Sequence, residues 1–274
     1  MSIINQIAAT QPLKTFVTRV VESLPYAARV VLLDMIRNGI VRKPPFSGVY
    51  RRFDEVAANY PTDATRRAFA KAGLAIKHEE AADLAILRRS HSLLPAVVGM
   101  LAPFSKPVRI LDFGGSGGID YLNLKNTIAA DVRYHIVDLP AICEAGRELW
   151  PSEPAISFSE ALPGDEQFDV VYSWSAIHYV PDPLALLVRF TQYKPKAILI
   201  VHSPFANRSF VRAQSQGAFR FPQWVVSLPD TERAMREAGY RLIMRATDEF
   251  SYNVDNYQPA YRVPHMANLL FVPN

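Results

Sequence analysis

The chain has 274 residues, enough for one large domain or for one domain with a helical extension. Charged residues make up 20% of it and hydrophobic residues 49%, which is ordinary for a globular protein in water. The single cysteine, Cys143, excludes an internal disulfide and a metal site built from several cysteines. The first residues lack the features of a signal peptide and no apolar run has membrane-spanning length, so we expect a cytoplasmic protein.

Positive charge is concentrated in the first third of the chain. Residues 1–95 hold fourteen Lys and Arg against eight Asp and Glu, a net charge of +6. The whole chain carries +4, so residues 96–274 carry −2. This asymmetry favours an anionic partner, such as a substrate phosphate, an acidic sugar or a membrane surface. A solvated helical face explains it equally well, and we expect no nucleic acid partner.

The first forty residues contain an apolar stripe at helical spacing. Its members are Leu13, Phe16, Val17, Val20, Val21 and Leu24. Pro25 interrupts the stripe, and the apolar pattern resumes over residues 30–40, with Gly39 as a helix end. We expect these helices to pack on the core. Peripheral membrane contact is the alternative, because basic residues flank the stripe.

A turn or linker is predicted at residues 42–48, where two prolines precede Phe46, Ser47 and Gly48. Two helices are predicted after it, at about 63–75 and 79–102, with Asp63 as a cap of the first. His78 and His91 are too far apart for a metal pair on one helix face. We therefore interpret both histidines as structural or exposed, and we expect no metal site.

From about residue 106 strands and helices alternate, which predicts an α/β fold with a mostly parallel sheet and helices on both faces. The predicted strands are 108–113, 133–138, 156–162, 168–174, 196–202, 240–245 and 268–272. The predicted helices are 119–130, 141–149 and 229–239. We divide the chain into a helical extension or lid, residues 1–95, and a ligand-binding domain, residues 96–274.

The most informative stretch is residues 108–118, where an apolar run ends in Asp112 and four glycines follow at 114, 115, 117 and 118. It predicts a buried strand and a tight turn into a helix, the place where open α/β sheets bind ligands. A P-loop would end in Gly-Lys-Ser/Thr, which is absent here. A dinucleotide fingerprint needs glycines at the first, third and sixth positions, and neither Gly114 nor Gly115 starts such a register.

A second acid, Asp138, ends the second predicted strand about two dozen residues after the loop. Nucleotide-binding sheets place a ribose-binding carboxylate close to this spacing. A carboxylate suits that role because it accepts hydrogen bonds from both ribose hydroxyls. The alternative is that Asp138 caps the helix that begins near Pro140.

An acid, one residue and then clustered glycines resembles the S-adenosylmethionine loop of class I methyltransferases. The resemblance implies S-adenosylmethionine as the cofactor, with the acid near its methionine part, and a seven-stranded sheet whose last strand is antiparallel. Residues near Glu160 would contact the adenine ring. The implied cofactor-binding residues are Asp112, Gly114, Gly115, Ser116, Gly118, Asp138, Leu139, Glu160, Ser173 and Trp174.

Further segments are similar to a family of bacterial methyltransferases associated with surface-polysaccharide genes. They are residues 46–50, 53–55, 111–115, 173–180, 182–183, 198–200 and 203–205. The chain departs from the family at Ser116, a glycine in the commonest pattern, and at Val201 and His202, where the family tends to have an acid and an arginine. The resemblance implies methylation, most simply O-methylation, of a small-molecule or glycan-type acceptor.

Two histidines are candidates for a catalytic base, which would assist an oxygen nucleophile. His178 follows the fourth strand and His202 ends the fifth, and packing or substrate orientation is the alternative role for His178. Trp174 or Tyr121 would cover the adenine or face the sulfonium, unless they are core residues. We expect two irregular segments to cover the substrate, 205–228 with four aromatic residues and 251–265 with Tyr252, Tyr257 and Tyr261.

Three functions compete for this sequence. The favoured one is an S-adenosylmethionine-dependent methyltransferase. The second is an NAD(P)-dependent oxidoreductase or epimerase. The glycine spacing argues against it, because it does not fit the dinucleotide-binding fingerprint. The third is a non-catalytic protein of the methyltransferase fold that binds a partner through its basic front. The sequence gives neither the oligomeric state nor the acceptor.

Overall fold

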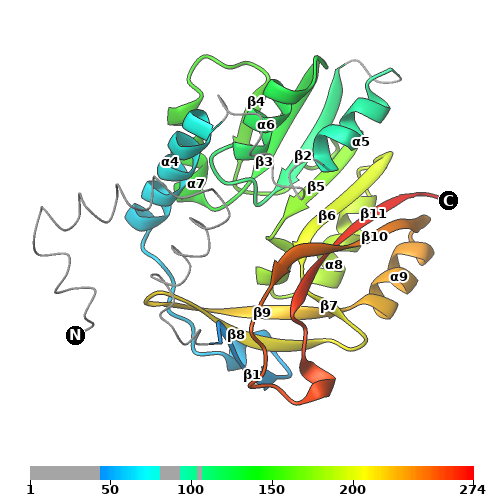
Figure 1. The fold of residues 1–274 in the computed structure, drawn as a ribbon. Coiled ribbons are helices and arrows are strands. Elements are labelled where there is room, and N and C mark those ends of the chain that lie inside the picture. Colours follow the sequence, from blue (N-terminus) through cyan, green and yellow to red (C-terminus); the bar gives the residue numbers. More distant parts are fainter. Residues whose placement is uncertain (1–43, 81–92, 104–106) are drawn as a thin grey trace, which may run out of the picture. The chain divides into compact units, whose positions relative to one another are not determined.

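A computed structural model describes residues 44–80, 93–103 and 107–274 (Figure 1). The chain divides into two compact units, Met1–Pro44 and Pro45–Asn274, and the described residues after Pro44 belong to the second. The apolar stripe of residues 13–24, its predicted membrane contact and His91 lie outside the described residues. The predicted boundary near residue 95 stays a prediction.

A seven-stranded sheet has the order β10-β11-β6-β5-β2-β3-β4 (Figure 1). The pairs among β2 to β6 are parallel, whereas β11 pairs antiparallel with both β6 and β10. This confirms the predicted mostly parallel sheet with an antiparallel last strand. The strands are β2 Val108–Phe113, β3 Val132–Val137, β4 Ile156–Ser159, β5 Val170–Trp174, β6 Ala197–Ser203, β10 Tyr240–Ser251 and β11 His265–Pro273.

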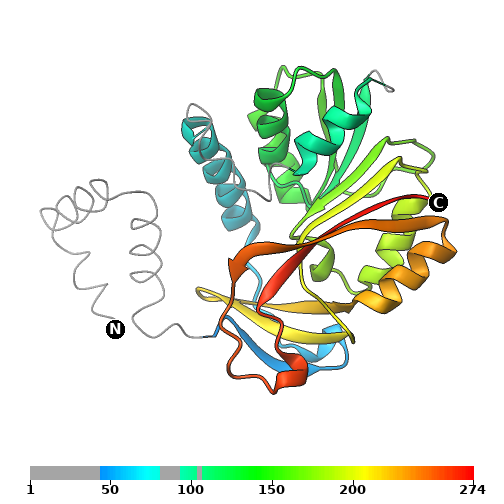
Figure 2. The ribbon, with the colours of Figure 1, turned by 45° about the vertical axis from the view of Figure 1, so that its right-hand side comes forward.

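Helices cover both faces of this sheet, as predicted (Figure 2). On one face α5 (Leu93–Leu101) and α6 (Ile119–Thr127) pack on alternate residues of the central strands. On the other face α8 (Pro183–Thr191) and α9 (Leu228–Glu237) pack on the intervening residues. Because both faces are covered, every residue of β6 is buried, which explains its nearly continuous apolar run.

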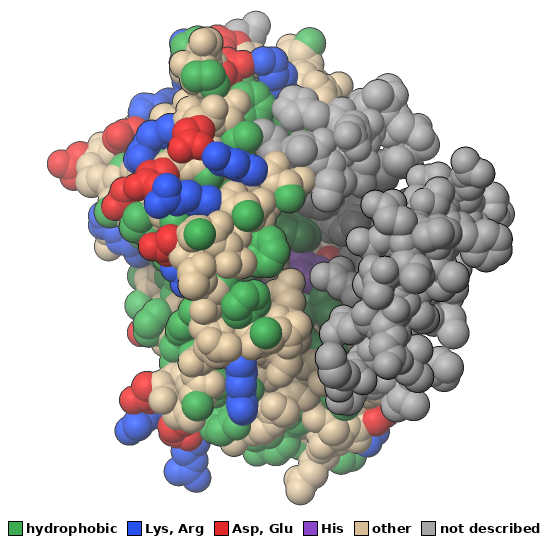
Figure 3. Space-filling view, turned by 90° about the vertical axis from the view of Figure 1, so that its left-hand side faces the viewer, with side chains coloured by type: hydrophobic (Ala, Val, Ile, Leu, Met, Phe, Trp, Pro, Cys, Tyr) green, Lys and Arg blue, Asp and Glu red, His purple; other side chains and the backbone are tan. Residues whose placement is uncertain are grey.

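At the β4 edge, α7 (Pro140–Leu149) packs against α4 (Asp63–Glu80). Ala70 of α4 is buried with two residues of α7, and Arg67 pairs with Glu144 at 2.9 Å. Exposed ion pairs of this kind contribute little to the free energy of unfolding. Figure 3 shows acidic and basic side chains mixed over this face. Asp63 was expected to cap α4, but the Thr65 amide donates to Thr62 Oγ1 (3.3 Å), so Thr62 is the cap.

A second sheet of four strands has the order β1-β8-β9-β7 and occupies the lower part of Figure 1. Its strands are β1 Phe46–Tyr50, β7 Phe205–Ala206, β8 Phe210–Gln216 and β9 Phe219–Ser227. The prediction of an irregular segment over 205–228 is therefore wrong, as is the predicted turn where β1 begins. Gly217, with φ +61°, lies in a two-residue turn between β8 and β9, a typical hairpin connection that we did not recognise.

Other predicted boundaries shift by a few residues because tertiary pairing, rather than propensity, ends each element. The predicted helix 79–102 is represented by the end of α4 and by α5, and the residues between these two are not described. Short 3-10 turns occur at Phe53–Glu55, Ile177–Tyr179 and Pro259–Tyr261. The last of these lies in the otherwise irregular connection between β10 and β11, which agrees with the prediction for 251–265.

Candidate functional site

The strand order reverses between β2 and β5, since β3 and β4 continue from β2 on one side and β6 follows β5 on the other. Open α/β sheets bind ligands at the carboxyl ends of the strands at such a point. The glycine loop, residues 114–118, follows β2, and Asp138 follows β3. Ser175 follows β5. The structure thus brings the two motifs of the sequence to one edge of the sheet.

Backbone donors tie the glycine loop to the end of β3. The Ser116 amide donates to Asp138 Oδ2 (2.9 Å) and the Leu139 amide donates to Asp138 Oδ1 (2.7 Å). The Gly114 amide donates to the Val137 carbonyl (2.8 Å). Each carboxylate oxygen of Asp138 has a second lone pair, so the half-buried side chain keeps acceptor capacity for a ligand.

The glycines at this edge leave no room for side chains. A Cβ on Gly114, whose φ is +79°, would lie 2.2 Å from the Cβ of Ala176 in the loop after β5. A Cβ on Gly115 would lie 2.2 Å from Asp112 Oδ2, and one on Gly118 would lie 2.9 Å from Trp150 Nε1. The loop backbone is therefore in direct contact with its neighbours and is held in one conformation.

Replacing Gly115 with alanine is expected to lower the free energy of unfolding by about 1–3 kcal/mol, because the new methyl group overlaps the Asp112 carboxylate. Urea denaturation of both proteins measures the change. Gly164→Ala is the matched control, since nothing lies within 4 Å of its added Cβ. A Gly115→Ala protein as stable as the control would contradict the tight packing of the loop.

Asp112 is fully buried at the end of β2. Its Oδ2 accepts a hydrogen bond from the Tyr134 hydroxyl (2.8 Å), and no described residue hydrogen-bonds to its Oδ1. Burial, followed by the charge of Asp120, raises the pKa of Asp112 well above 3.8. The carboxyl group lies against Gly115 and not on an open surface. The predicted place of Asp112 beside the ammonium group of the cofactor stays a prediction.

The other predicted cofactor residues also lie at this edge, with different exposure. Leu139 and Glu160 are exposed, whereas Ser173 is buried and donates its hydroxyl to the Phe113 carbonyl (2.9 Å). Trp174 is half-buried at the end of β5. Tyr121 packs among core residues of the sheet, so the core alternative holds for it. Direct contact of these residues with the cofactor stays a prediction.

Three non-glycine residues at the carboxyl ends of β2, β5 and β6 have left-handed backbone conformations. They are Ser116 (φ 52°), Ser175 (φ 55°) and His202 (φ 53°). Each such conformation costs on the order of 1–3 kcal/mol and persists only where the surroundings enforce it. Their grouping at one edge is consistent with the predicted ligand site there, since strained residues cluster at such sites.

His178, the first candidate base, lies fully buried in the 3-10 turn after β5. Its Nδ1 is 3.3 Å from Ser203 Oγ, and its Nε2 has no hydrogen-bond partner within the described ranges. Burial, with smaller contributions from His202 and Arg212, lowers the pKa of His178 well below 6.5. The imidazole is therefore neutral at pH 7 and shielded from water.

This buried neutral histidine predicts a dependence of stability on pH. Below about pH 6.5 the unfolded chain binds a proton at His178 that the folded chain does not. The stability present above that pH is thus lost as the pH falls, by up to about 1.4 kcal/mol per unit. In His178→Gln the loss between pH 7.5 and 5.5, measured by urea denaturation, is expected to be smaller. His135, whose pKa burial also lowers, contributes equally in both proteins, so identical slopes would contradict the prediction.

His202, the second candidate, is held by contacts on three sides. Its Nδ1 lies 2.8 Å from Asp248 Oδ2 and its Nε2 lies 3.0 Å from the Tyr252 hydroxyl. The indole of Trp174 stacks on its ring with centroids 5.5 Å apart. The Asn268 side chain accepts a hydrogen bond from the backbone amide of His202 (2.8 Å).

Sequence reasoning missed Asp248 and Arg212. Asp248 lies in the part of β10 beyond the predicted strand end, and Arg212 lies in the segment expected to be irregular. Both are buried, at 4% and 0% exposure. The usable signal was a charged residue inside an apolar strand pattern, since charged side chains are seldom buried without a partner.

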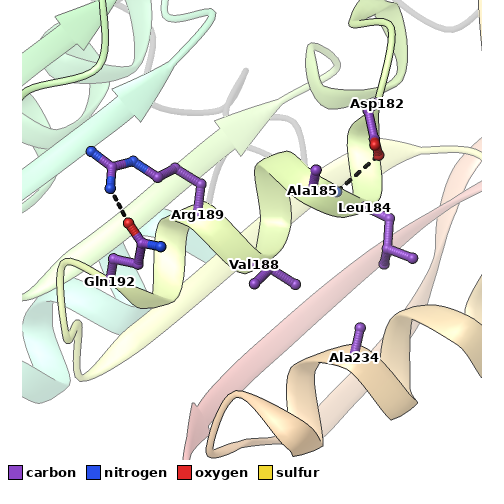
Figure 4. A pocket seen from close by; sticks show the side chains of 7 residues that line it. All are labelled: Asp182, Leu184, Ala185, Val188, Arg189, Gln192 and Ala234. Carbon is purple, nitrogen blue, oxygen red and sulfur yellow. Dashed lines mark hydrogen bonds between the residues drawn. The ribbon is translucent and has the colours of Figure 1, made fainter.

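A shallow groove between α8 and α9 lies away from this edge (Figure 4). Asp182 caps α8 by accepting from the Ala185 amide (2.9 Å), and Arg189 donates to Gln192. The one carboxylate among the lining residues, Asp182, is used as the helix cap, and we assign the groove no function. Its lining residues are Asp182, Leu184, Ala185, Val188, Arg189, Gln192 and Ala234.

Comparison with protein-family models matches residues 85–244 to a methyltransferase domain. The chain belongs to the methyltransferase domain family. The match contains the glycine loop, Asp138, both candidate histidines and the strands that carry them. It confirms the predicted methyltransferase and, at the level of the family, S-adenosylmethionine as its cofactor. A comparison with curated proteins finds no match.

Solved structures share the fold at low sequence identity. A Haloferax volcanii protein described as a methyltransferase, in complex with the Trm112 methyltransferase activator, is 15% identical with a TM-score of 0.50, covering 76% of this chain and 96% of that one. The Burkholderia thailandensis 1,6-didemethyltoxoflavin-N1-methyltransferase is 15% identical with a TM-score of 0.48, covering 80% and 93%. CalS10, an amino pentose methyltransferase from Micromonospora echinaspora, is 14% identical with a TM-score of 0.46, covering 79% and 99%.

Within the described residues, no helix is long and apolar enough to cross a membrane.

Proposed function

We propose that this methyltransferase transfers the methyl group of S-adenosylmethionine to an oxygen of a small-molecule or glycan-type acceptor, with His202 as the base. The observation that carries this proposal is the chain of contacts Asp248–His202–Tyr252 beside Trp174. An oxygen nucleophile gains from a base because the hydroxyl loses its proton as the new bond forms. A nitrogen acceptor that is already uncharged has less need of one.

The residues at the glycine loop fit the proposed cofactor. S-adenosylmethionine supplies a methyl group on a positively charged sulfur and also carries an ammonium group. The charges of Asp120 and Asp138 act on Asp112, so acidic groups gather at this edge, and one oxygen of Asp112 has no hydrogen-bond partner among the described residues. Ser116 is half-buried, and Asp138, which accepts from its amide at 2.9 Å, offers further acceptors for the ribose.

The contacts of His202 fix its protonation. As a carboxylate, Asp248 can only accept a hydrogen bond, so His202 Nδ1 carries the ring proton and Nε2 carries the lone pair. The Tyr252 hydroxyl now occupies the position, 3.0 Å from Nε2, that an acceptor hydroxyl would take. With an acceptor hydroxyl at that position, His202 Nε2 would take its proton as the oxygen forms its bond, and bound S-adenosylmethionine would supply the methyl group.

His178 is the weaker candidate for this role. Its imidazole is fully buried, and the nearest hydroxyl, that of Ser203, belongs to the protein core. No carboxylate in the described part of the chain hydrogen-bonds to it. A base without an orienting partner is less suited to taking a proton from a substrate.

Calorimetry and a transfer assay test the proposed function. We expect S-adenosylmethionine and its demethylated product to bind. Titration with NAD is expected to show no heat of binding. A methyl-labelled donor, offered with alcohols and with amines of matched size, is expected to label the alcohols. Binding of NAD instead would favour the oxidoreductase alternative. Labelling of amines only would refute O-methylation while leaving the methyltransferase in place.

A further inference from the structure

The feature that this site leaves unexplained is a buried arginine in the second sheet. Arg212 of β8 has no exposed surface. Its Nε donates to Gln223 Oε1 (2.7 Å), and its Nη1 donates to the Val263 carbonyl (3.4 Å). Its Cζ lies 3.4 Å from the centre of the Phe46 ring, and its Nη2 has no hydrogen-bond partner in the part of the chain that the structure describes. The guanidinium is thus fixed in place with one donor group left over.

No carboxylate pairs with this cation among the described residues. The groups whose charges act on Arg212 are the tyrosines 179, 252 and 257, and burial lowers the pKa of the guanidinium to about 10. A buried charge without a counter-charge is costly, by several kcal/mol in general. Proteins retain such a cation where a ligand supplies the negative charge, as arginine commonly does for carboxylates.

Further buried polar groups around Arg212 also lack partners. Among residues 44–80, 93–103 and 107–274, neither the Tyr257 hydroxyl nor Nε2 of His178 has a hydrogen-bond partner. Tyr257 is buried with Phe46, the residue under the guanidinium, and the charge of Arg212 acts on both Tyr257 and His178. Three incomplete polar groups in one cluster are rare in a folded protein, where most buried polar atoms are hydrogen-bonded.

This cluster adjoins the proposed base. Tyr252, whose hydroxyl hydrogen-bonds to His202 Nε2, packs edge-on against Phe46 at a centroid distance of 5.3 Å. His202 thus contacts Trp174 directly and is linked to the Arg212 cluster through Tyr252 and Phe46. An acceptor lying between them would reach His202 with a hydroxyl and Arg212 with a second group.

We propose that the acceptor carries a carboxylate, which binds to Arg212 Nη2 and the Tyr257 hydroxyl while its hydroxyl group lies at His202. This inference rests on the proposed O-methylation. A carboxylate fits better than a phosphate, because the cluster offers one cation and a few donors, whereas a phosphate dianion commonly needs more positive charge. The substrate class is therefore a small hydroxy acid, including sugar acids.

Binding of simple carboxylates to the full chain tests this site. The probes are benzoate and acetate, with benzamide and acetamide as neutral counterparts of the same shape, and inorganic phosphate. Calorimetry at constant ionic strength measures each affinity. We expect benzoate to bind at least about tenfold more tightly than benzamide, a difference of about 1.4 kcal/mol.

Variants test which residues cause the preference for benzoate over benzamide. Arg212→Gln is expected to abolish the preference for benzoate, and Tyr257→Phe to reduce it about threefold to tenfold. Tyr257→Phe removes one hydroxyl group only and keeps the test valid if Arg212→Gln does not fold. Arg241→Gln, which changes an exposed arginine of β10, is expected to leave the preference unchanged.

The possible results distinguish a failure of the carboxylate site from a failure of the proposed function. Equal binding of benzoate and benzamide, or a benzoate preference that survives in both Arg212→Gln and Tyr257→Phe, would overturn the carboxylate site. Phosphate binding that depends on Arg212 and exceeds benzoate binding would overturn the choice of carboxylate. The demethylated cofactor product is titrated in parallel. Its failure to bind the parent protein would instead refute the proposed function.

Discussion

Asp138→Ala is expected to weaken binding of S-adenosylmethionine and of its demethylated product by more than about tenfold. Two effects of the carboxylate are lost together. It holds the glycine loop through the Ser116 amide at 2.9 Å, and its remaining lone pairs are the predicted acceptors for the ribose hydroxyls. The loop would lose its anchor at the position where Ser116 already has a left-handed backbone. Isothermal titration calorimetry measures both affinities.

Asp131→Ala is the control for that experiment. Asp131 is exposed and precedes the first residue of β3, at the opposite end of the strand from Asp138. It carries the same charge, so a general loss of negative charge would affect both variants alike. An unchanged affinity in Asp138→Ala would remove Asp138 from the cofactor site and with it the fit between the loop and S-adenosylmethionine.

His202→Asn is expected to lower the rate of methyl transfer by about a hundredfold to ten-thousandfold, the usual range for loss of a general base. The affinity for the demethylated product is expected to change much less, because His202 takes the acceptor proton in the proposed reaction. The rate is measured with an acceptor found in the labelling assay, over a range of pH. We expect the pH profiles of the parent and the variant to differ.

Asp248→Asn tests the same mechanism through the positioning residue. The amide can donate to His202 Nδ1, which favours the ring form whose Nε2 carries the proton and is no longer a base. We therefore expect a smaller but clear loss of rate, about tenfold or more. His265→Asn, a change of an exposed histidine of β11, serves as the control. A His202→Asn enzyme with normal rate and normal pH profile would refute the base.

The glycine loop and Asp138 could be predicted from the sequence because their signals are local. A strand that ends in a tight turn needs glycine at a position such as Gly114, where φ is positive and Ala176 lies against it. The acid at the end of the next parallel strand then lies at the same edge by the geometry of the sheet alone. The same reasoning placed His178 and His202 at this edge, since each follows a parallel strand.

The ranking of the two histidines could not be predicted in this way. What distinguishes them is a partner far along the chain: Asp248 is 46 residues from His202, on a strand paired two positions away in the sheet. The position of Arg212 could not be predicted from the sequence for a related reason. Its strand, β8, pairs with β1 and β9 in the second sheet, and more than 150 residues separate β1 from β8 in the sequence. No local sequence pattern predicts that pairing.

The sequence by itself determined the α/β class, the seven strands of the main sheet and the edge at which the methyl donor is predicted to bind. These follow from hydrophobic period and glycine geometry, which act between residues close in the chain. Only the tertiary structure decided which side chains meet at the acceptor side, where His202 contacts Asp248 and Arg212 lies on Phe46. Those contacts depend on strand pairing between distant segments, and such pairing arises from the packing of the whole core.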